Sequence, residues 1–116
     1  MGMQPPKRVE AVIRRIIRAY RPDRIVVFGS FARGDQHDDS DVDLLIVKEG
    51  VEERFFDRVE AVLACCSGDI AVEPLVYTPT ELRRMVEEGN DFITTALSEG
   101  IVVYDKQESG RGTTMV

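Results

Sequence analysis

Two short apolar runs limit what this chain can fold into more than any other feature. Residues 24–28 (Arg-Ile-Val-Val-Phe) are rich in β-branched side chains and end at Gly29, a pattern typical of a buried strand that enters a turn. Residues 41–47 are polar at their start and continuously apolar from Leu44 onward, which predicts a second strand. The segment 34–40 contains a glycine and three aspartates but no aliphatic residue, so we expect a loop there.

Apolar side chains with helical spacing surround these two strands. After Pro5-Pro6 they recur at intervals of three and four residues up to Tyr20, which indicates an amphipathic helix that ends near Arg21-Pro22. Similar spacing, together with start and stop signals, predicts further helices at residues 52–66, 79–88 and 91–98, and a last strand at residues 101–104.

A third strand is predicted at residues 69–77. Pro74 assigns this strand to an edge of the sheet, because proline has no N–H group to donate to a neighbouring strand. Thr78-Pro79-Thr80-Glu81 follows directly and has the sequence of a capping box with proline at the first helical position. We therefore expect a helix to begin there.

The order of these elements is helix, strand, turn, strand, helix, strand, helix, helix, strand. It predicts an α/β (α+β) fold, with a small mixed β-sheet flanked by helices. A length of 116 residues allows one core, so we expect a single domain at residues 1–104. Residues 105–116 are polar and contain glycine, and we expect a flexible C-terminal tail.

Charge is distributed unevenly along the chain, whose net charge is −6. The first 24 residues carry seven Lys or Arg and two acidic residues, whereas the other 92 residues sum to −11. An acidic body argues against a long nucleic acid as a partner, since such binding needs a basic face. Two interpretations of the basic segment stay open, a surface for another partner and a solvated helix face.

The sequence contains no sign of a membrane or of an oxidising compartment. No apolar run approaches the roughly 20 residues that span a bilayer, and basic residues interrupt any signal-peptide core, so we expect a cytoplasmic protein. Cys65 and Cys66 are adjacent, which hinders a disulfide between them, and they lack the spacing of metal ligands. We expect both cysteines to be buried and reduced.

Two carboxylates stand at the polar start of the second strand. Asp41 and Asp43 are two residues apart, so their side chains project from the same face of the strand. Unpaired carboxylates this close repel one another, and their pKa values rise unless a cation lies between them. Two Mg²⁺ ions about 3.5–4 Å apart, bridged by such carboxylates, form the arrangement used in phosphoryl displacement. The pair therefore predicts a divalent-cation site.

The turn after the first strand has the properties of a phosphate site. Gly29 has no side chain, so backbone N–H groups can approach a triphosphate, and the Ser30 hydroxyl adds a donor. A short helix beginning at Ser30 would direct further N–H groups toward the phosphates. Arg33 can reach the same anion, and the alternative for Arg33 is an exposed arginine with no phosphate role.

Together, Gly29-Ser30, the ten residues 31–40 and Asp41-Val42-Asp43 resemble the DNA polymerase β-like nucleotidyltransferase superfamily, and specifically its minimal nucleotidyltransferase branch. The pattern of that family is Gly-Ser, ten residues, then Asp-x-Asp. The Phe-Ala-Arg-Gly continuation and the apolar run at residues 44–47 agree with it as well. The resemblance covers roughly residues 9–104 and implies the polymerase β-like nucleotidyltransferase fold.

The resemblance also implies a third carboxylate, on a later strand and a few residues before a Thr-Pro helix start. Glu73 has this position, although the family more often has aspartate there. Asp69 is the competing candidate. The alternatives are a solvated edge position for Glu73 and a turn or helix-stop role for Asp69.

The expected site consists of two sets of residues. The catalytic and metal-binding set is Asp41, Asp43 and Glu73, and the nucleotide-binding set is Gly29, Ser30, Arg33 and Ser40. A structural role as a cap is the alternative for Ser40. The single histidine, His37, is expected to be a solvated loop residue. The loop also contains Asp35, Asp38 and Asp39, but the segment lacks the glutamate and the central glycine of an EF-hand calcium loop.

The function implied by the resemblance is Mg²⁺-dependent transfer of a nucleoside monophosphate, expected to be AMP from ATP, onto a hydroxyl group, with two Mg²⁺ ions as cofactors. Stand-alone members commonly pair with a helical HEPN ribonuclease toxin and act as antitoxins that adenylylate a toxin tyrosine. Two alternatives stay open. One is a non-catalytic antitoxin that acts by contact, and the other is a small-molecule nucleotidyltransferase of the antibiotic-modifying type.

Overall fold

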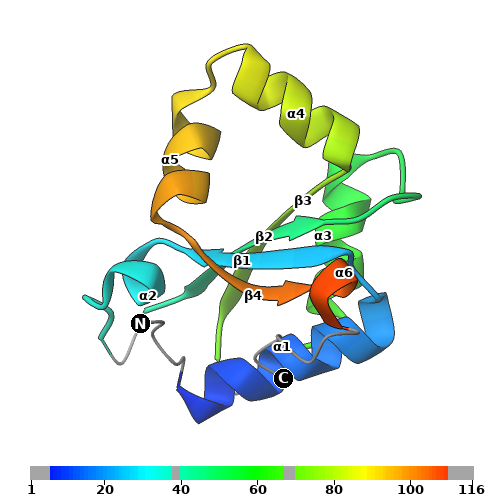
Figure 1. Ribbon diagram of the computed structural model, residues 1–116. Coiled ribbons are helices and arrows are strands. Elements are labelled where there is room, and N and C mark those ends of the chain that lie inside the picture. The colour runs from blue at the N-terminus through cyan, green and yellow to red at the C-terminus, as the bar shows by residue number, and fades with distance from the viewer. Residues whose placement is uncertain (1–5, 38–39, 67–69, 110–116) are drawn as a thin grey trace.

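The computed structural model describes residues 6–37, 40–66 and 70–109, which form a four-stranded mixed sheet with helices on both faces (Figure 1). The strands are β1 (Arg24–Phe28), β2 (Val42–Val47), β3 (Val72–Tyr77) and β4 (Ile101–Asp105). The helices are α1 (Lys7–Tyr20), α2 (Ser30–Arg33), α3 (Phe55–Leu63), α4 (Pro79–Glu87), α5 (Asp91–Glu99) and α6 (Lys106–Ser109). The predicted fold class is confirmed.

The strand order in the sheet is β3-β2-β1-β4. β1 runs antiparallel to both of its neighbours, β2 and β4, whereas β2 and β3 run parallel. The parallel pair needs a crossover connection, and α3 supplies it. β3 lies at an edge of the sheet, as Pro74 predicted.

Each face of the sheet has its own apolar core. Successive side chains of a strand point to opposite faces, so a continuously apolar strand needs cover on both. Ile25 and Val27 of β1 pack under α1 and α3, while Val26 and Phe28 pack under α4 and α5. α1 buries Val9, Val12, Ile13, Ile16 and Tyr20, which are among the residues whose spacing predicted that helix. This double cover explains the two apolar runs of the sequence.

α4 begins with the predicted capping box. The Glu81 backbone N–H donates to Thr78 Oγ1 (3.1 Å), and the Thr78 N–H donates to Glu81 Oε1 (2.9 Å). The same carboxylate accepts two hydrogen bonds from the guanidinium of Arg58 on α3 (2.7 and 3.1 Å). Arg58 is 6% exposed and is the one buried charged residue among those described. A buried ion pair therefore joins α3 to the start of α4.

Three element boundaries differ from the sequence prediction. The helix expected at residues 52–66 is shorter, because the carbonyls of Glu52 and Glu53 accept hydrogen bonds from Arg58 (2.6 and 3.3 Å) and the segment before Phe55 is held outside the helix. The described part of the third strand begins at Val72. Asp105, expected to open a flexible tail, ends β4 and is followed by α6, while residues 110–116 lie outside the described part of the chain.

The cysteines lie just after α3. Cys65 and Cys66 are free and half-buried, and each thiol donates to the carbonyl four residues earlier, so the expectation of full burial is wrong. Within the described residues, no helix combines the length and the apolarity that crossing a membrane requires.

Candidate active site

A cleft of about 780 Å³ lies where β1 ends and where β2 and β3 begin. Its volume is within the range of small-molecule sites, about 300–1,000 Å³. α2 and α5 both lie at this end of the sheet (Figure 1). The cleft is lined by Phe28, Gly29, Ser30, Arg33, Asp35, His37, Ser40, Asp41, Asp43, Glu73, Leu75, Phe92, Thr95, Ala96 and Glu99.

The parallel pairing of β2 with β3 brings the three predicted carboxylates together. Asp43 and Glu73 are partners in the register of the two strands, so their side chains lie next to each other on one face. Asp41 immediately precedes β2, and Asp41 and Asp43 are both close enough to Glu73 to influence the pKa of its carboxylate. All three line the cleft. The competing candidate Asp69 lies outside the described residues.

The surroundings of Asp43 and Glu73 raise the pKa values of both carboxylates. Burial raises the pKa of Asp43, and the negative charge of Asp41 raises it further. The hydrogen bond with Asp41 and the charge of Asp43 raise the pKa of Glu73. Burial and mutual repulsion therefore disfavour the ionised forms of Asp43 and Glu73 in the absence of a cation.

Gly29 is required at the turn because of this cluster. Its backbone has φ 75° and ψ −149°, a region that only glycine occupies readily. A Cβ atom at position 29 would overlap Asp43 Oδ2 and lie 3.1 Å from Asp43 Cγ. The glycine thus lets the backbone of the turn approach the carboxylate directly. α2 begins at Ser30, so the short helix that the sequence analysis considered is present, and Phe31 anchors it by burying its ring.

The polar loop residues take part in local interactions at the cleft. Arg33 Nε donates to Asp35 Oδ2 (3.2 Å) on the surface. Ser40 Oγ accepts from the His37 backbone N–H (2.8 Å), so the Ser40 hydroxyl closes a turn as well as lining the cleft. His37, expected to be a solvated loop residue, lines the cleft too. Asp38 and Asp39 lie outside the described residues.

α5 forms a wall of the cleft that the sequence did not predict. Asn90 caps the helix by accepting from the Ile93 backbone N–H (3.0 Å), and Ile93 and Ala96 bury themselves against the sheet. The next positions around the helix, at spacings of three and four, are Phe92, Thr95 and Glu99, and they face the cleft. The sequence signal for this wall is Phe92, whose position beside the buried stripe leaves a large aromatic ring outside the core.

The chemistry of the carboxylates suits a divalent cation. Hard cations such as Mg²⁺ prefer carboxylate oxygens, and a cation among Asp41, Asp43 and Glu73 would offset the repulsion that helps to raise the pKa values of Asp43 and Glu73. In the described residues, no group of three or more His, Cys, Asp or Glu side chains is already arranged around one point as metal ligands. Cation binding would therefore require these side chains to reorient.

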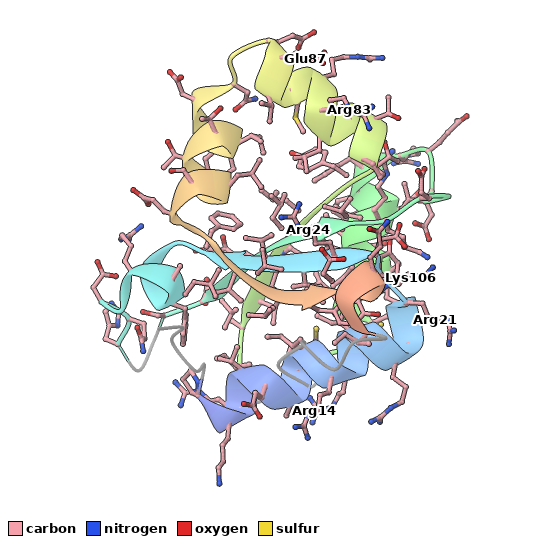
Figure 2. All side chains as sticks on the ribbon, in the orientation of Figure 1. Arg14, Arg21, Arg24, Arg83, Glu87 and Lys106 are labelled. Atoms are coloured by element: carbon pink, nitrogen blue, oxygen red, sulfur yellow. The ribbon has the colours of Figure 1, made fainter. Side chains whose placement is uncertain are left out.

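The basic N-terminal helix is remote from the cleft. Figure 2 shows Arg14 and Arg21 projecting outward from α1, on the side of the molecule away from α5. Arg14 makes an exposed ion pair with Glu10 one turn earlier (3.7 Å). These positions agree with the interpretation of this segment as a solvated helix face.

Two sequence comparisons relate the chain to known proteins. The nucleotidyltransferase domain family matches it over residues 9–103. A protein of Methanocaldococcus jannaschii, named as a candidate protein adenylyltransferase, is 34% identical over 73 residues, which cover 60% of this chain and 74% of the relative.

Solved structures with the same fold include three with TM-scores above 0.5. A candidate nucleotidyltransferase from Sulfolobus solfataricus has a TM-score of 0.61 and 24% identity, covering 88% of this chain and 81% of that chain. A toxin–antitoxin complex with AMP-PNP has a TM-score of 0.54 and 17% identity, covering 90% and 77%. A mutant of the toxin–antitoxin MntA–HpeT has a TM-score of 0.55 and 13% identity, covering 88% and 76%. At these identities the likeness concerns the fold.

Proposed function

This chain belongs to the nucleotidyltransferase domain family, and from that membership we propose that it transfers AMP from ATP to a hydroxyl group of a partner protein, with Mg²⁺ as cofactor. The observation that carries the proposal is the convergence of Asp41, Asp43 and Glu73 in a cleft that also contains the Gly29-Ser30 turn. The name of the M. jannaschii relative supports a protein as the acceptor.

In this proposal each part of the cleft has a separate task. The carboxylates of Asp41, Asp43 and Glu73 would hold two Mg²⁺ ions, which would supply positive charge beside the phosphates and the acceptor hydroxyl. The Gly29-Ser30 turn binds phosphate oxygens through backbone N–H groups and the Ser30 hydroxyl. Arg33 and Ser40 line the same cleft and add donors. The acceptor hydroxyl gives its proton to solvent as its oxygen bonds to the α-phosphorus, the bond from that phosphorus to pyrophosphate breaks, and the residues act by positioning and electrostatics.

We extend the proposal to the partner. Two structures that share the fold are toxin–antitoxin complexes, and one contains AMP-PNP. By analogy the acceptor is a tyrosine of a helical HEPN toxin, and this chain is the antitoxin. Fold-level analogy supports such an assignment without replacing a test of it.

The test is transfer of label from ATP to the partner. The chain is incubated with labelled ATP, Mg²⁺ and the co-purified helical partner, and the partner is then examined by mass spectrometry for AMP on tyrosine. Asp43→Asn is expected to abolish transfer, because it removes a charge from the metal site. Asp57→Asn on α3, which removes an aspartate outside the cleft, is expected to retain it. Full transfer by Asp43→Asn would refute the proposal, and an unmodified but inhibited partner would support action by contact.

A further inference from the structure

Phe92 is an exposed aromatic residue inside the candidate active site. It lines the cleft from α5 and is 57% exposed, although its neighbours Ile93 and Ala96 are buried. Nothing in the packing of α5 on the sheet uses most of the Phe92 ring. When a ligand covers an exposed apolar ring, the apolar surface is removed from water, and this favours binding.

The Phe92 ring is held in place by a neighbour. It makes an edge-type contact with Phe28, with ring centroids 5.7 Å apart and ring planes at 85°. Phe28 is itself 8% exposed and belongs to the core under α4 and α5. One side of Phe92 is therefore fixed, while the rest of the ring stays open to the cleft. Because the ring is already held, its side chain loses little conformational entropy when a ligand binds against it.

The cleft has two walls of different chemistry. Its polar part contains the three carboxylates and the Gly29-Ser30 turn, and its apolar part contains Phe28, Leu75 and Phe92. A nucleoside triphosphate has the same division, because it carries a cation-bound polyanion at one end and a flat aromatic base at the other.

We propose that Phe92 is the stacking platform for the nucleotide base. This inference rests on the proposed function and adds the residue that binds the base. Every base has a π-face, so stacking on Phe92 contributes affinity for the nucleotide without selecting one base. Purines are bound more tightly than pyrimidines, because their rings cover more of the Phe92 surface. The chemical class of the ligand at this wall is thus a planar heteroaromatic ring.

A fluorescence experiment tests the contact directly. The chain contains no tryptophan, so Phe92→Trp creates a single reporter at this position. Titration with Mg²⁺ and ATP is expected to quench its emission in a saturable way, whereas Mg²⁺ and tripolyphosphate, which has no base, are expected to leave it unchanged. Phe56→Trp on α3 is the matched control, since Phe56 is 60% exposed and lies outside the cleft. A reporter at position 92 that ATP does not affect would overturn the inference.

A binding experiment measures the contribution of the ring. Calorimetry on Phe92→Leu is expected to give a Kd for ATP about tenfold weaker than that of the wild type, with the Kd for tripolyphosphate unchanged. Phe56→Leu is expected to change neither value. If Phe92→Leu and the wild type bind ATP equally well, the inference is overturned. This holds even if modification of the partner is lost, because Phe92 would then contact the acceptor and not the base. A wild-type chain that does not bind ATP would refute the proposed function as well.

Discussion

At the level of single residues, one glycine determines how closely the turn approaches the carboxylates. Gly29 combines a backbone region that other residues avoid with a position directly against the Asp43 side chain. Its contribution is therefore geometric, and a side chain there meets both a conformational and a steric obstacle.

We predict that Gly29→Ala weakens ligand binding at the cleft more than it lowers the stability of the fold. The backbone strain is expected to cost roughly 1–3 kcal/mol of stability, and the added methyl group displaces the Asp43 carboxylate. Binding of Mg²⁺ and ATP should weaken at least about tenfold, as for other groups that hold a ligand in position. Thermal unfolding and calorimetry measure the two effects.

Gly50→Ala is the matched control for this substitution. Gly50 also has a positive φ, of 67°, but nothing lies within 4 Å of the position its Cβ would occupy. The variant is expected to lose about 1–2 kcal/mol, because alanine is strained in the left-handed region, and to keep wild-type nucleotide affinity. If Gly29→Ala binds the nucleotide as well as Gly50→Ala does, the steric argument is wrong.

At the level of secondary-structure elements, the ion pair of Arg58 and Glu81 joins α3, β3 and α4. The guanidinium donates to the Glu81 carboxylate, to the Val76 carbonyl of β3 (3.2 Å) and to the carbonyls before α3. The Arg58 hydrogen bond lowers the pKa of Glu81. A lowered pKa contributes stability above the pKa of glutamate in the unfolded chain, and that stability is lost as pH falls through the lower folded value.

We predict that Arg58→Met costs about 2–3 kcal/mol of stability at neutral pH, because the buried Val76 carbonyl and the part-buried carbonyls of Glu52 and Glu53 lose their donor. The loss should shrink as pH falls through the lowered pKa of Glu81, because below that value Glu81 is protonated in both variants. Arg54→Met is the control. Its side chain is 78% exposed and 3.9 Å from Asp57, so a change within about 0.5 kcal/mol is expected. Urea unfolding curves at several pH values measure this, and equal losses for both variants would contradict it.

At the level of the whole molecule, the carboxylate cluster opposes folding in the absence of a cation. The pKa values of Asp43 and Glu73 are raised in the folded chain. Groups with raised pKa values contribute stability below their unfolded pKa, and this contribution is lost as pH rises through the folded values. The metal-free protein therefore carries an unfavourable charge cluster at neutral pH, and the net charge of the whole chain is already −6.

We predict that Mg²⁺ stabilises the chain at about pH 7.5 and much less at about pH 5, where protons compete for the carboxylates. At a hundred times its Kd the cation should add about 2.7 kcal/mol, and EDTA should remove this gain. Asp43→Asn should unfold at a higher temperature than the metal-free wild type at neutral pH and should respond weakly to Mg²⁺. Sodium chloride at equal ionic strength is the control. An equal rise in Tm with both salts would contradict the prediction.

Much of this molecule follows from short-range patterns in the chain. Apolar spacing predicted α1, the two apolar runs predicted β1 and β2, and Thr78-Pro79-Thr80-Glu81 predicted the start of α4. These signals depend on neighbours within a few residues, because helix periodicity and capping are local. The Gly29-Ser30 and Asp-x-Asp pattern likewise indicated where the site lies, while the roles of its residues stay predictions.

The remaining features depend on contacts between distant segments. The parallel pairing of Asp43 with Glu73, the cleft wall formed by Phe92 and the ion pair of Arg58 with Glu81 join residues 23 to 64 positions apart in the chain. Strand direction, register and the neighbours of a buried charge are set by how the whole core packs. Local patterns do not set these choices, so only the folded arrangement decides how the carboxylates meet and which aromatic ring lines the same cleft.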